Sequence, residues 1–347
     1  SLPRRLRDRC HERLPPFLDR LRRAGHEMHR AEPHERADQD PPRKLKTPPP
    51  PMNPMPGSPS VCPSVAPRYD TLISAAELRS LLAAQAPRVV LLDCGFDLAD
   101  AAAGERAFDQ GHLPGAVYVH LDRDLSGAKT GGNGRHPLPP PQALAERAGA
   151  WGIAPDVQVV CYDNQGMPYA ARAWWLLRWL GHTAVAVLDG GVSAWLAAGA
   201  VLSAQRSTVQ AQPPYPYRAD AMPSIGAAEL LATLGRRPVL DARAGERFRG
   251  ETEPLDAVAG HIPGAHNRFF KDNLQPDGRY KPAAVLRAEF SALQLDPSLL
   301  VHQCGSGVTA CHNLLAMEHA GLGGSALYPG SWSEWCADPQ RPVARGA

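Results

Sequence analysis

Short apolar runs alternate with longer helical patterns along most of this chain. Three such runs lie in its first half, at Val89 to Asp93, Val157 to Tyr162 and Thr183 to Leu188. They are apolar on both faces, which is typical of strands buried inside a parallel sheet. A helix is predicted over Tyr169 to Leu180. Strands that alternate with helices predict an α/β fold, with a central, mostly parallel sheet flanked by helices on both faces.

The second half of the chain repeats the first. The segment Gly111 to Ala116, read GHLPGA, returns as Gly260 to Ala265, read GHIPGA. Other segments return at similar offsets of about 140 to 152 residues, including Ile73 to Leu78 as Ile225 to Leu230, Val89 to Asp93 as Pro238 to Asp241, and Val187 to Gly191 as Leu327 to Ser331. We therefore expect two tandem copies of one domain, at 67–200 and 224–343. The proline-rich segment 201–223 is the expected linker, wrapped along the outside.

Each copy carries signals for the beginning or end of a helix. Ser74 with Glu77 three residues later is a capping-box pattern that begins a helix in the first copy. In the second copy, an apolar run at Ser298 to Val301 predicts the end of a buried strand. Thr309 to Ala320 has the composition of a helix, and Gly321 is placed to end it. The residues between this strand and this helix therefore form a turn.

Cys304 lies on that turn and is the candidate nucleophile. Gly305 and Gly307 allow the loop to fold tightly with positive backbone torsions, so that successive N–H groups converge on the sulfur. These amides and the positive end of the following helix favour a thiolate. The alternative is an inert cysteine that only fills space, but such a residue does not require a Gly-Ser-Gly loop behind it.

A cysteine phosphatase would also place its nucleophile on a turn between a strand and a helix. That class needs an arginine six or seven residues later to bind phosphate oxygens. Here Ala310 and Cys311 occupy those positions. The loop therefore favours a smaller electrophile delivered to sulfur over a phosphate dianion.

The loop Cys304 to Ala310, read CGSGVTA, resembles the active-site loop of the two-domain rhodanese-type sulfurtransferases, in particular the 3-mercaptopyruvate branch. The resemblance covers about residues 70 to 343. The thiosulfate branch usually carries basic residues where Gly305 and Ser306 stand.

The resemblance implies that Cys304 takes sulfane sulfur as a persulfide and passes it to a second nucleophile, without metal or cofactor. The amides of the loop residues Gly305, Gly307, Val308, Thr309 and Ala310 would form the anion cradle.

The resemblance also implies residues that bind the sulfur donor. Arg247 matches the family position that binds substrate and is expected to hold the donor carboxylate, the alternative being an ion pair with Glu246 or Glu251. Arg243 is a second candidate, although it follows Asp241 at a strand end and is better suited to orienting the loop.

A second substrate-binding arginine often precedes the Gly-His-Ile-Pro-Gly segment in this branch. The segment Glu251 to Gly260 contains none, which leaves Arg249 or Arg268 as substitutes. The missing arginine bears on the identity of the donor more than on the type of reaction.

Two further side chains have a functional and a structural interpretation each. Ser306 could hydrogen-bond the donor and belong to a proton relay, as in the family, or be a small residue chosen for size. His112 resembles a family position that faces the active site from the first domain. Both His112 and His261 could instead be structural histidines that hold their loops in place.

The first copy is predicted to be catalytically inactive. Alignment of the two copies places Asp163 where the nucleophile should stand, and a carboxylate cannot accept sulfane sulfur. Cys161 comes two residues earlier and belongs to the strand, so we interpret it as a core residue.

Composition and charge narrow the function classes. The 347 residues carry a net charge of +2, with 13 Lys and Arg against 8 Asp and Glu in residues 1–50. The remainder is slightly acidic, so nucleic-acid binding is not expected. No apolar run approaches the 18 residues of a membrane span. Seven scattered cysteines without a Cys-x-x-Cys pair suit a reducing, cytoplasmic location and exclude a disulfide framework or zinc site.

Residues 1–66 differ from the rest of the chain. They are rich in Arg, His and Pro and contain few residues that could build a core. We expect a disordered extension, because eight acidic residues argue against a transit peptide.

Three functions are compatible with the sequence. The leading prediction is a sulfurtransferase that uses 3-mercaptopyruvate as donor and a thiol, thioredoxin or cyanide as acceptor. The same enzyme could use thiosulfate. The third possibility is a persulfide carrier without turnover, which receives sulfur from a partner protein and passes it on.

Overall fold

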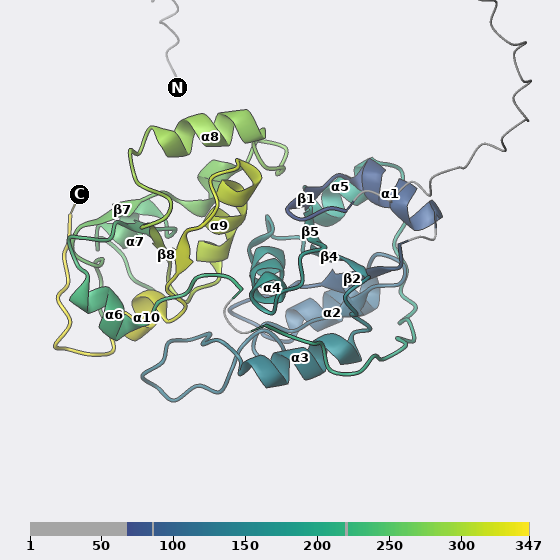
Figure 1. Ribbon diagram of the computed structural model, residues 1–347, viewed down its shortest axis with the longest axis horizontal. Helices are drawn as coiled ribbons and strands as arrows, with labels where there is room; N and C mark the ends of the chain where they lie inside the picture. The colour runs from purple at the N-terminus through teal and green to yellow at the C-terminus, as the bar shows by residue number, and fades with distance from the viewer. Residues whose placement is uncertain (1–67, 85–86, 219–220, 347) are drawn as a thin grey trace, which may run out of the picture. The chain divides into compact units, whose positions relative to one another are not determined.

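The computed structural model describes residues 68–84, 87–218 and 221–346. The predicted disordered extension at 1–66 lies outside these residues. Two α/β domains follow one another along the described chain, each built on its own parallel sheet (Figure 1).

The first sheet has five parallel strands in the order β1-β5-β4-β2-β3. Its strands are β1 Leu72–Ile73, β2 Val89–Asp93, β3 Val117–Tyr118, β4 Gln158–Tyr162 and β5 Val185–Leu188. Its helices are α1 Ala75–Ala84, α2 Ala103–Gln110, α3 Pro141–Ala150, α4 Pro168–Trp179 and α5 Gly191–Ala197. The predicted strands and helix are confirmed within two residues at each end. The capping box is also present, since the Glu77 N–H donates to Ser74 Oγ and the Ser74 N–H to Glu77 Oε2.

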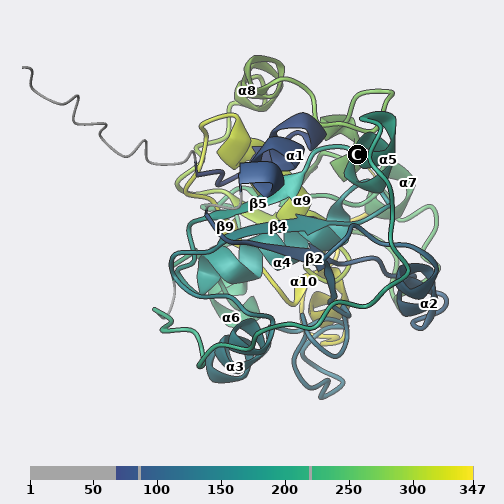
Figure 2. The same cartoon turned by 90° about the vertical axis from the view of Figure 1, so that its right-hand side faces the viewer.

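Alternating side chains of this sheet build two separate cores. Leu91 and Val160 pack with residues of α1, α2 and α5, whereas Leu92 and Val159 pack with residues of α3 and α4. Figure 2 shows α1 and α5 on one side of the strands and α3 and α4 on the other. A parallel sheet buried on both faces requires apolar side chains on both, which is why the strands have continuous apolar runs.

The second sheet has four parallel strands in the order β7-β6-β8-β9. Its strands are β6 Val239–Asp241, β7 Ala265–Asn267, β8 Val301–Gln303 and β9 Ala326–Leu327. Its helices are α6 Ala227–Ala232, α7 Gly245–Phe248, the 3-10 helix η1 Phe270–Asn273, α8 Ala283–Ser291, α9 Thr309–His319 and α10 Ser331–Trp335.

The strand predicted to end at Val301 begins there instead. Ser298 to Leu300 form a turn, in which the Ser298 N–H donates to the Asp296 carboxylate and the Leu300 N–H to the Asp296 carbonyl. Leu299 is 45% exposed. The apolar run of the sequence therefore contained a turn residue, and β8 extends directly to the residue before Cys304.

Helices α4 and α9 pack against each other and join the two domains (Figure 1). Almost every residue of both helices is buried, including Trp174 and Trp175 in α4 and Cys311 in α9. A helix that is buried all round must be covered on more than one side. Each of these helices follows the loop at the end of its central strand, so their contact brings the two loops near each other.

The segment predicted as a linker packs along the first domain. Ser203 exchanges two backbone hydrogen bonds with His112, and the Gln212 N–H and Tyr215 N–H donate to carbonyls of α3. These contacts agree with a linker that runs along the outside of the first domain.

His302 in β8 makes stability sensitive to acid. Its ring is fully buried with no hydrogen-bond partner, and burial lowers its pKa to about 3, whereas an unfolded histidine titrates near 6.5. The unfolded chain therefore binds the extra proton below pH 6.5, and stability falls with pH from there toward 3. In urea unfolding, His302→Leu should remove roughly 1.5 kcal/mol of the stability that the wild type loses between pH 6.5 and 5. The matched control His266→Leu replaces an exposed histidine and should leave that loss unchanged. Equal dependence of the unfolding free energy on pH in wild type and His302→Leu would contradict this prediction.

Candidate functional site

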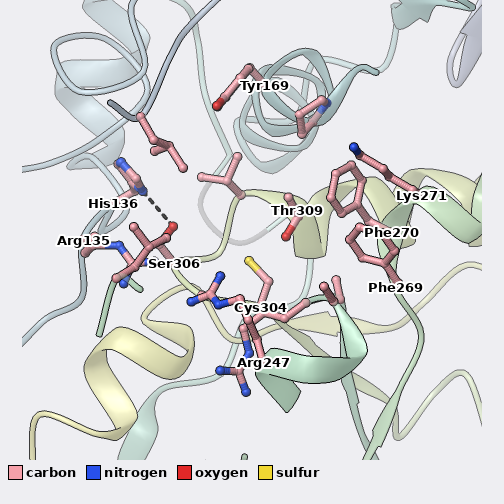
Figure 3. A pocket seen from close by; sticks show the side chains of 18 of the residues that line it. Arg135, His136, Tyr169, Arg247, Phe269, Phe270, Lys271, Cys304, Ser306 and Thr309 are labelled. Carbon is pink, nitrogen blue, oxygen red and sulfur yellow. Dashed lines mark hydrogen bonds between the residues drawn. The ribbon is translucent and has the colours of Figure 1, made fainter. Parts of the chain in front are cut away.

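Cys304 lies where the sequence predicted, on the tight turn between β8 and α9. Gly307 has φ +76°, and a Cβ there would lie 2.3 Å from the Pro329 carbonyl oxygen, so only glycine fits. Cys304 is 2% exposed and borders a cavity of about 320 Å³. The cavity is lined by residues of both domains, and Figure 3 shows the Cys304 sulfur directed into it.

Arginines from both domains lie beside the residue that follows Cys304. A Cβ on Gly305 would lie 2.7 Å from Arg135 Nη2 and 3.6 Å from both terminal nitrogens of Arg247. Arg135 belongs to the first domain and Arg247 to α7 of the second. Glycine at 305 thus leaves room for two guanidinium groups in the cavity that Cys304 borders.

Acidic residues hold these arginines in place. Arg247 pairs with Glu253 Oε1 at 2.6 Å and with Asp256 Oδ2 at 3.4 Å, and Arg135 pairs with the same Asp256. The predicted alternative partners of Arg247, Glu246 and Glu251, do not pair with it.

Neither predicted substitute for the second arginine reaches the cavity. Arg249 pairs with Glu251 on the surface, and Arg268 pairs with Glu289. Arg135 lies beside Arg247 and is therefore the candidate for the second substrate-binding arginine, which the segment Glu251 to Gly260 does not supply. Sequence comparison with the family segment before Gly260 could not find it, because it comes from the other domain.

Arg243 lines the cavity, but its guanidinium is already bonded to acidic and carbonyl groups of its own domain. It is buried, binds Asp241 Oδ2 from Nε and Nη2 at 3.0 and 2.7 Å, and donates to the Gly260 carbonyl at 2.7 Å. It also pairs with Glu253 and lies 4.8 Å from the Trp332 ring. This geometry matches the structural interpretation of Arg243, because all three guanidinium nitrogens already donate to acceptors within the protein.

Ser306, His136 and Asp122 form a series of polar side chains that crosses between the domains, the Ser306 series. The Ser306 Oγ lies 2.8 Å from Nδ1 of the buried His136 (Figure 3). The His136 Nε2 lies 3.6 Å from Asp122 Oδ1, which is an ion-pair distance and too long for a hydrogen bond. Burial lowers the pKa of His136 to about 3, with Arg172 and other cations adding to the effect and Asp122 opposing it. The ring is thus neutral at pH 7, and Asp122 favours the proton on Nε2, so that Nδ1 accepts from the Ser306 hydroxyl.

His112 does not reach this cavity. Its Nδ1 bonds the Phe108 carbonyl at 2.7 Å, its Nε2 bonds the Gln205 carbonyl at 3.2 Å, and its ring stacks on Phe108. His261 is held in the same manner by the carbonyl and ring of Phe248. The expectation that His112 faces the catalytic loop is therefore not met, because both of its ring nitrogens are used to hold its own loop. His136 is the histidine at the site.

The sequence does contain a signal for the segment that holds Arg135 and His136. Gly134 to His136, read GRH, returns as Gly278 to Tyr280, read GRY, each shortly before a helix. Each segment contacts the opposite domain, since the Arg135 N–H donates to Ser333 Oγ and the Tyr280 N–H to Asp189 Oδ1. The repeated triplet would have predicted a pair of interdomain contacts.

Arg172 of α4 is a buried cation beneath the catalytic loop. It is fully buried, and within the described ranges no carboxylate lies at ion-pair distance from it. It donates to the Gly307 carbonyl at 3.2 Å and the His136 carbonyl at 3.1 Å. Burial lowers its pKa, and the thiols of Cys311 and Cys304 act in the opposite direction. Arg172 therefore ties the loop of Cys304 to the segment of His136.

The corresponding loop of the first domain is already occupied by its own carboxylate. The buried Asp163 accepts four backbone N–H groups, from Gln165, Met167, Tyr169 and Ala170, at 2.8 to 3.0 Å. Burial raises the pKa of the Asp163 carboxyl, and these four N–H groups favour the carboxylate. The loop thus holds an anion, which supports the expectation that this type of turn forms an anion cradle.

In the described part of the chain, no group of three or more His, Cys, Asp or Glu side chains could hold a metal ion. None of the helices in that part is long and apolar enough to cross a membrane. Cys311 is buried, and its Sγ lies 3.3 Å from the Gly307 carbonyl, as expected for a packed side chain under the loop.

Several known proteins are similar to this chain in sequence and fold. Residues 74–198 and 226–338 each match the Rhodanese-like domain. A probable 3-mercaptopyruvate sulfurtransferase of Pseudomonas aeruginosa is 49% identical over 286 residues, which cover 79% of this chain and 98% of that protein. A putative thiosulfate sulfurtransferase, SseB, of Mycobacterium tuberculosis is 42% identical and covers 80% of this chain and 98% of its own length.

The fold is also similar to a solved structure, 3-mercaptopyruvate sulfurtransferase from Leishmania major. That match has a TM-score of 0.70 at 29% identity and covers 79% of this chain and 76% of the other. The matches of sequence and fold cover both α/β domains. The chain therefore belongs to the rhodanese-like family of sulfurtransferases, with two copies of the family's domain in tandem.

Proposed function

We propose that this protein transfers sulfane sulfur from 3-mercaptopyruvate to a thiol or cyanide acceptor through a persulfide on Cys304. One observation carries the proposal: two arginines, the hydrogen-bonded pair of Ser306 and His136, and the buried Cys304 all line one cavity. The first domain is catalytically inactive in this scheme, because Asp163 fills its loop with a carboxylate.

The donor carries a carboxylate and a carbonyl that need separate partners. The guanidinium groups of Arg135 and Arg247, which flank Gly305, are suited to bind the carboxylate, and planar guanidinium groups bind carboxylates with defined geometry. The donor sulfur then lies toward Cys304 and its carbonyl toward Ser306. This arrangement fixes the donor by its charged end and leaves its reactive end at the thiolate.

The first half-reaction forms one bond and breaks one. The Cys304 thiolate attacks the donor sulfur, a new S–S bond forms, and the C–S electron pair goes to the carbon to give the enolate of pyruvate. Ser306 takes the donor thiol proton as its own proton moves to His136 Nδ1, and the proton then returns to the enolate carbon. The products are the Cys304 persulfide and pyruvate. An acceptor nucleophile next attacks the outer sulfur and restores the thiolate.

Arg172 stabilises the anionic states electrostatically in this proposal. A buried cation without a carboxylate partner favours negative charge nearby, and Cys304 alternates between thiolate and persulfide anions. The ion pairs of Arg135, Arg243 and Arg247 with Asp241, Glu253 and Asp256 balance one another in charge. Arg172 thus provides the net positive charge beneath the loop.

Thiosulfate is the second candidate donor. Its support is the 42% identity to the Mycobacterium tuberculosis protein and the position of Lys271 at the cavity. Thiosulfate releases sulfite, and its leaving group needs no proton on carbon. With this donor the Ser306 series would therefore have no proton to transfer. The series therefore favours 3-mercaptopyruvate.

Small thiols or thioredoxin are the acceptors in this proposal, in the reducing, cytoplasmic location that the scattered cysteines of the sequence suit.

The carboxylate role of the two arginines can be tested by separate neutral substitutions. Arg135→Gln and Arg247→Gln should each raise the KM for 3-mercaptopyruvate at least tenfold, because each loses a charge-assisted contact with the carboxylate. The surface variant Arg249→Gln is the matched control and should leave the KM within twofold. Steady-state kinetics with cyanide as acceptor measures all three. An unchanged KM in either cavity variant would exclude that arginine from donor binding.

The proton relay predicts a loss that depends on the donor. Ser306→Ala and His136→Asn should each lower kcat with 3-mercaptopyruvate by roughly 10²-fold, the usual scale for a general acid–base group. Persulfide formation from thiosulfate, measured by mass spectrometry in a single turnover, should change less than threefold and serves as internal control. Equal losses with both donors would mean that the series only holds the loop in shape.

Arg172 gives a test that separates charge from shape. Arg172→Met should shift the alkylation of Cys304 by iodoacetamide to higher pH, since a cation that favours the thiolate is removed. Arg172→Lys keeps the charge and should retain the wild-type pH dependence, while kcat falls because the contacts to Gly307 and His136 are lost. If both variants alkylate with the wild-type pH dependence, the electrostatic role is refuted.

A further inference from the structure

The first domain has a cavity that corresponds to the catalytic cavity of the second. It has a volume of about 490 Å³ and lies at the carboxyl ends of β2 and β4, between α2 and α5. Its lining includes Asp93, Gly95, Gly111 and Val192. The proposed sulfur transfer uses none of these residues.

The two domains share the same backbone frame at this place. The Gly95 N–H donates to Asp93 Oδ1 at 2.9 Å, and the Arg243 N–H donates to Asp241 Oδ1 at the same distance. Gly111 precedes His112 as Gly260 precedes the similarly held His261. Asp93 and Gly95 are therefore the counterparts of Asp241 and Arg243.

In the second domain the corresponding space is filled by an arginine side chain. There the Arg243 side chain pairs with Asp241, donates to the Gly260 carbonyl at 2.7 Å and lies over the Trp332 ring. In the first domain Gly95 carries no side chain, and Val192 stands in place of the tryptophan. The cavity is the space that the arginine and the tryptophan would fill.

The acceptor groups for a cation remain in this space. Asp93 is 8% exposed and borders the cavity, and its Oδ1 accepts the Gly95 N–H. Within the part of the chain that the structure describes, no cationic side chain pairs with it. Burial raises the pKa of Asp93 to about 6, so the carboxylate is still the main form at pH 7.5. Ala107, in the turn of α2 that matches Arg247 in α7, adds no cation.

We propose that this cavity binds a guanidinium group carried on an alkyl chain, in the place that Arg243 occupies in the second domain. The guanidinium would pair with the Asp93 carboxylate, and its alkyl stem would pack on Val192 and the neighbouring Leu202. The ligand is an arginine side chain of another protein or a small alkylguanidine. This binding is independent of the sulfur donor and of Cys304.

Calorimetric titration of the full-length protein with n-propylguanidinium tests the proposal at pH 7.5 and constant ionic strength. We expect saturable binding at one site, and no binding of the neutral isostere n-propylurea. Asp93→Asn keeps the acceptor for the Gly95 N–H and should weaken binding at least tenfold. Gly95→Arg supplies the missing side chain and should abolish binding while raising the melting temperature. A Cβ at Gly95 meets only Asp93 Oδ1, at 3.1 Å, so the substitution can be accommodated.

Control variants separate this cavity from other acidic surfaces. Asp97→Asn, at the exposed rim, should bind within twofold of wild type, and Cys304→Ser should bind equally well. Tighter binding of an arginine-containing tripeptide than of n-propylguanidinium would identify a protein as the source of the ligand, and equal binding a small molecule. The proposal is overturned if wild type shows no saturation, or if Asp93→Asn and Gly95→Arg both bind as wild type does.

Discussion

The packing of α4 against α9 is the interaction on which the site depends. It places Arg172 of the first domain beneath the loop of Cys304 in the second, where it binds the carbonyls of Gly307 and His136. The cavity is lined from both domains, so neither domain alone would contain the whole site. Burial of the two helices on several sides supplies the apolar contact area that makes this arrangement rigid enough to hold Ser306 and His136 at hydrogen-bond distance.

The two copies of the domain use one loop geometry for two purposes. In the second copy the turn presents a thiol to a cavity, and in the first the Asp163 carboxylate bonds the N–H groups of its own turn. The Asp163 carboxylate satisfies backbone donors of the kind that would hold a persulfide in the second copy. At Gly95 the first copy differs in the opposite sense, because the arginine of the second copy is absent and its acidic partner, Asp93, is retained.

The sequence predicted the parts of this structure that depend on local pattern. The parallel strands, the tandem repeat and the turn of Cys304 all follow from apolar runs, capping residues and glycines, and the structure contains each of them. Residues whose position depends on contact between domains were missed or misplaced, since periodicity carries no information on how α4 meets α9. Arg135 and His136 lie in a proline- and glycine-rich loop without such periodicity, whereas His112 was proposed because it resembles a family position. The partners of Arg247 were missed for a different reason, because Glu253 and Asp256 lie six and nine residues away in an irregular loop of the same domain, where sequence spacing does not show which carboxylates approach the guanidinium.

In the proposed function a carboxylate-bearing thiol is the donor, and residues of both domains recognise it. The ratio of kcat/KM for 3-mercaptopyruvate to that for thiosulfate, measured with cyanide as acceptor, is the most direct test of this recognition. We predict a ratio well above one, because the arginine pair and the Ser306 series both serve the first donor and the series has no role with the second. A ratio below one would contradict it, and activity with neither donor would instead indicate a persulfide carrier loaded by a partner protein.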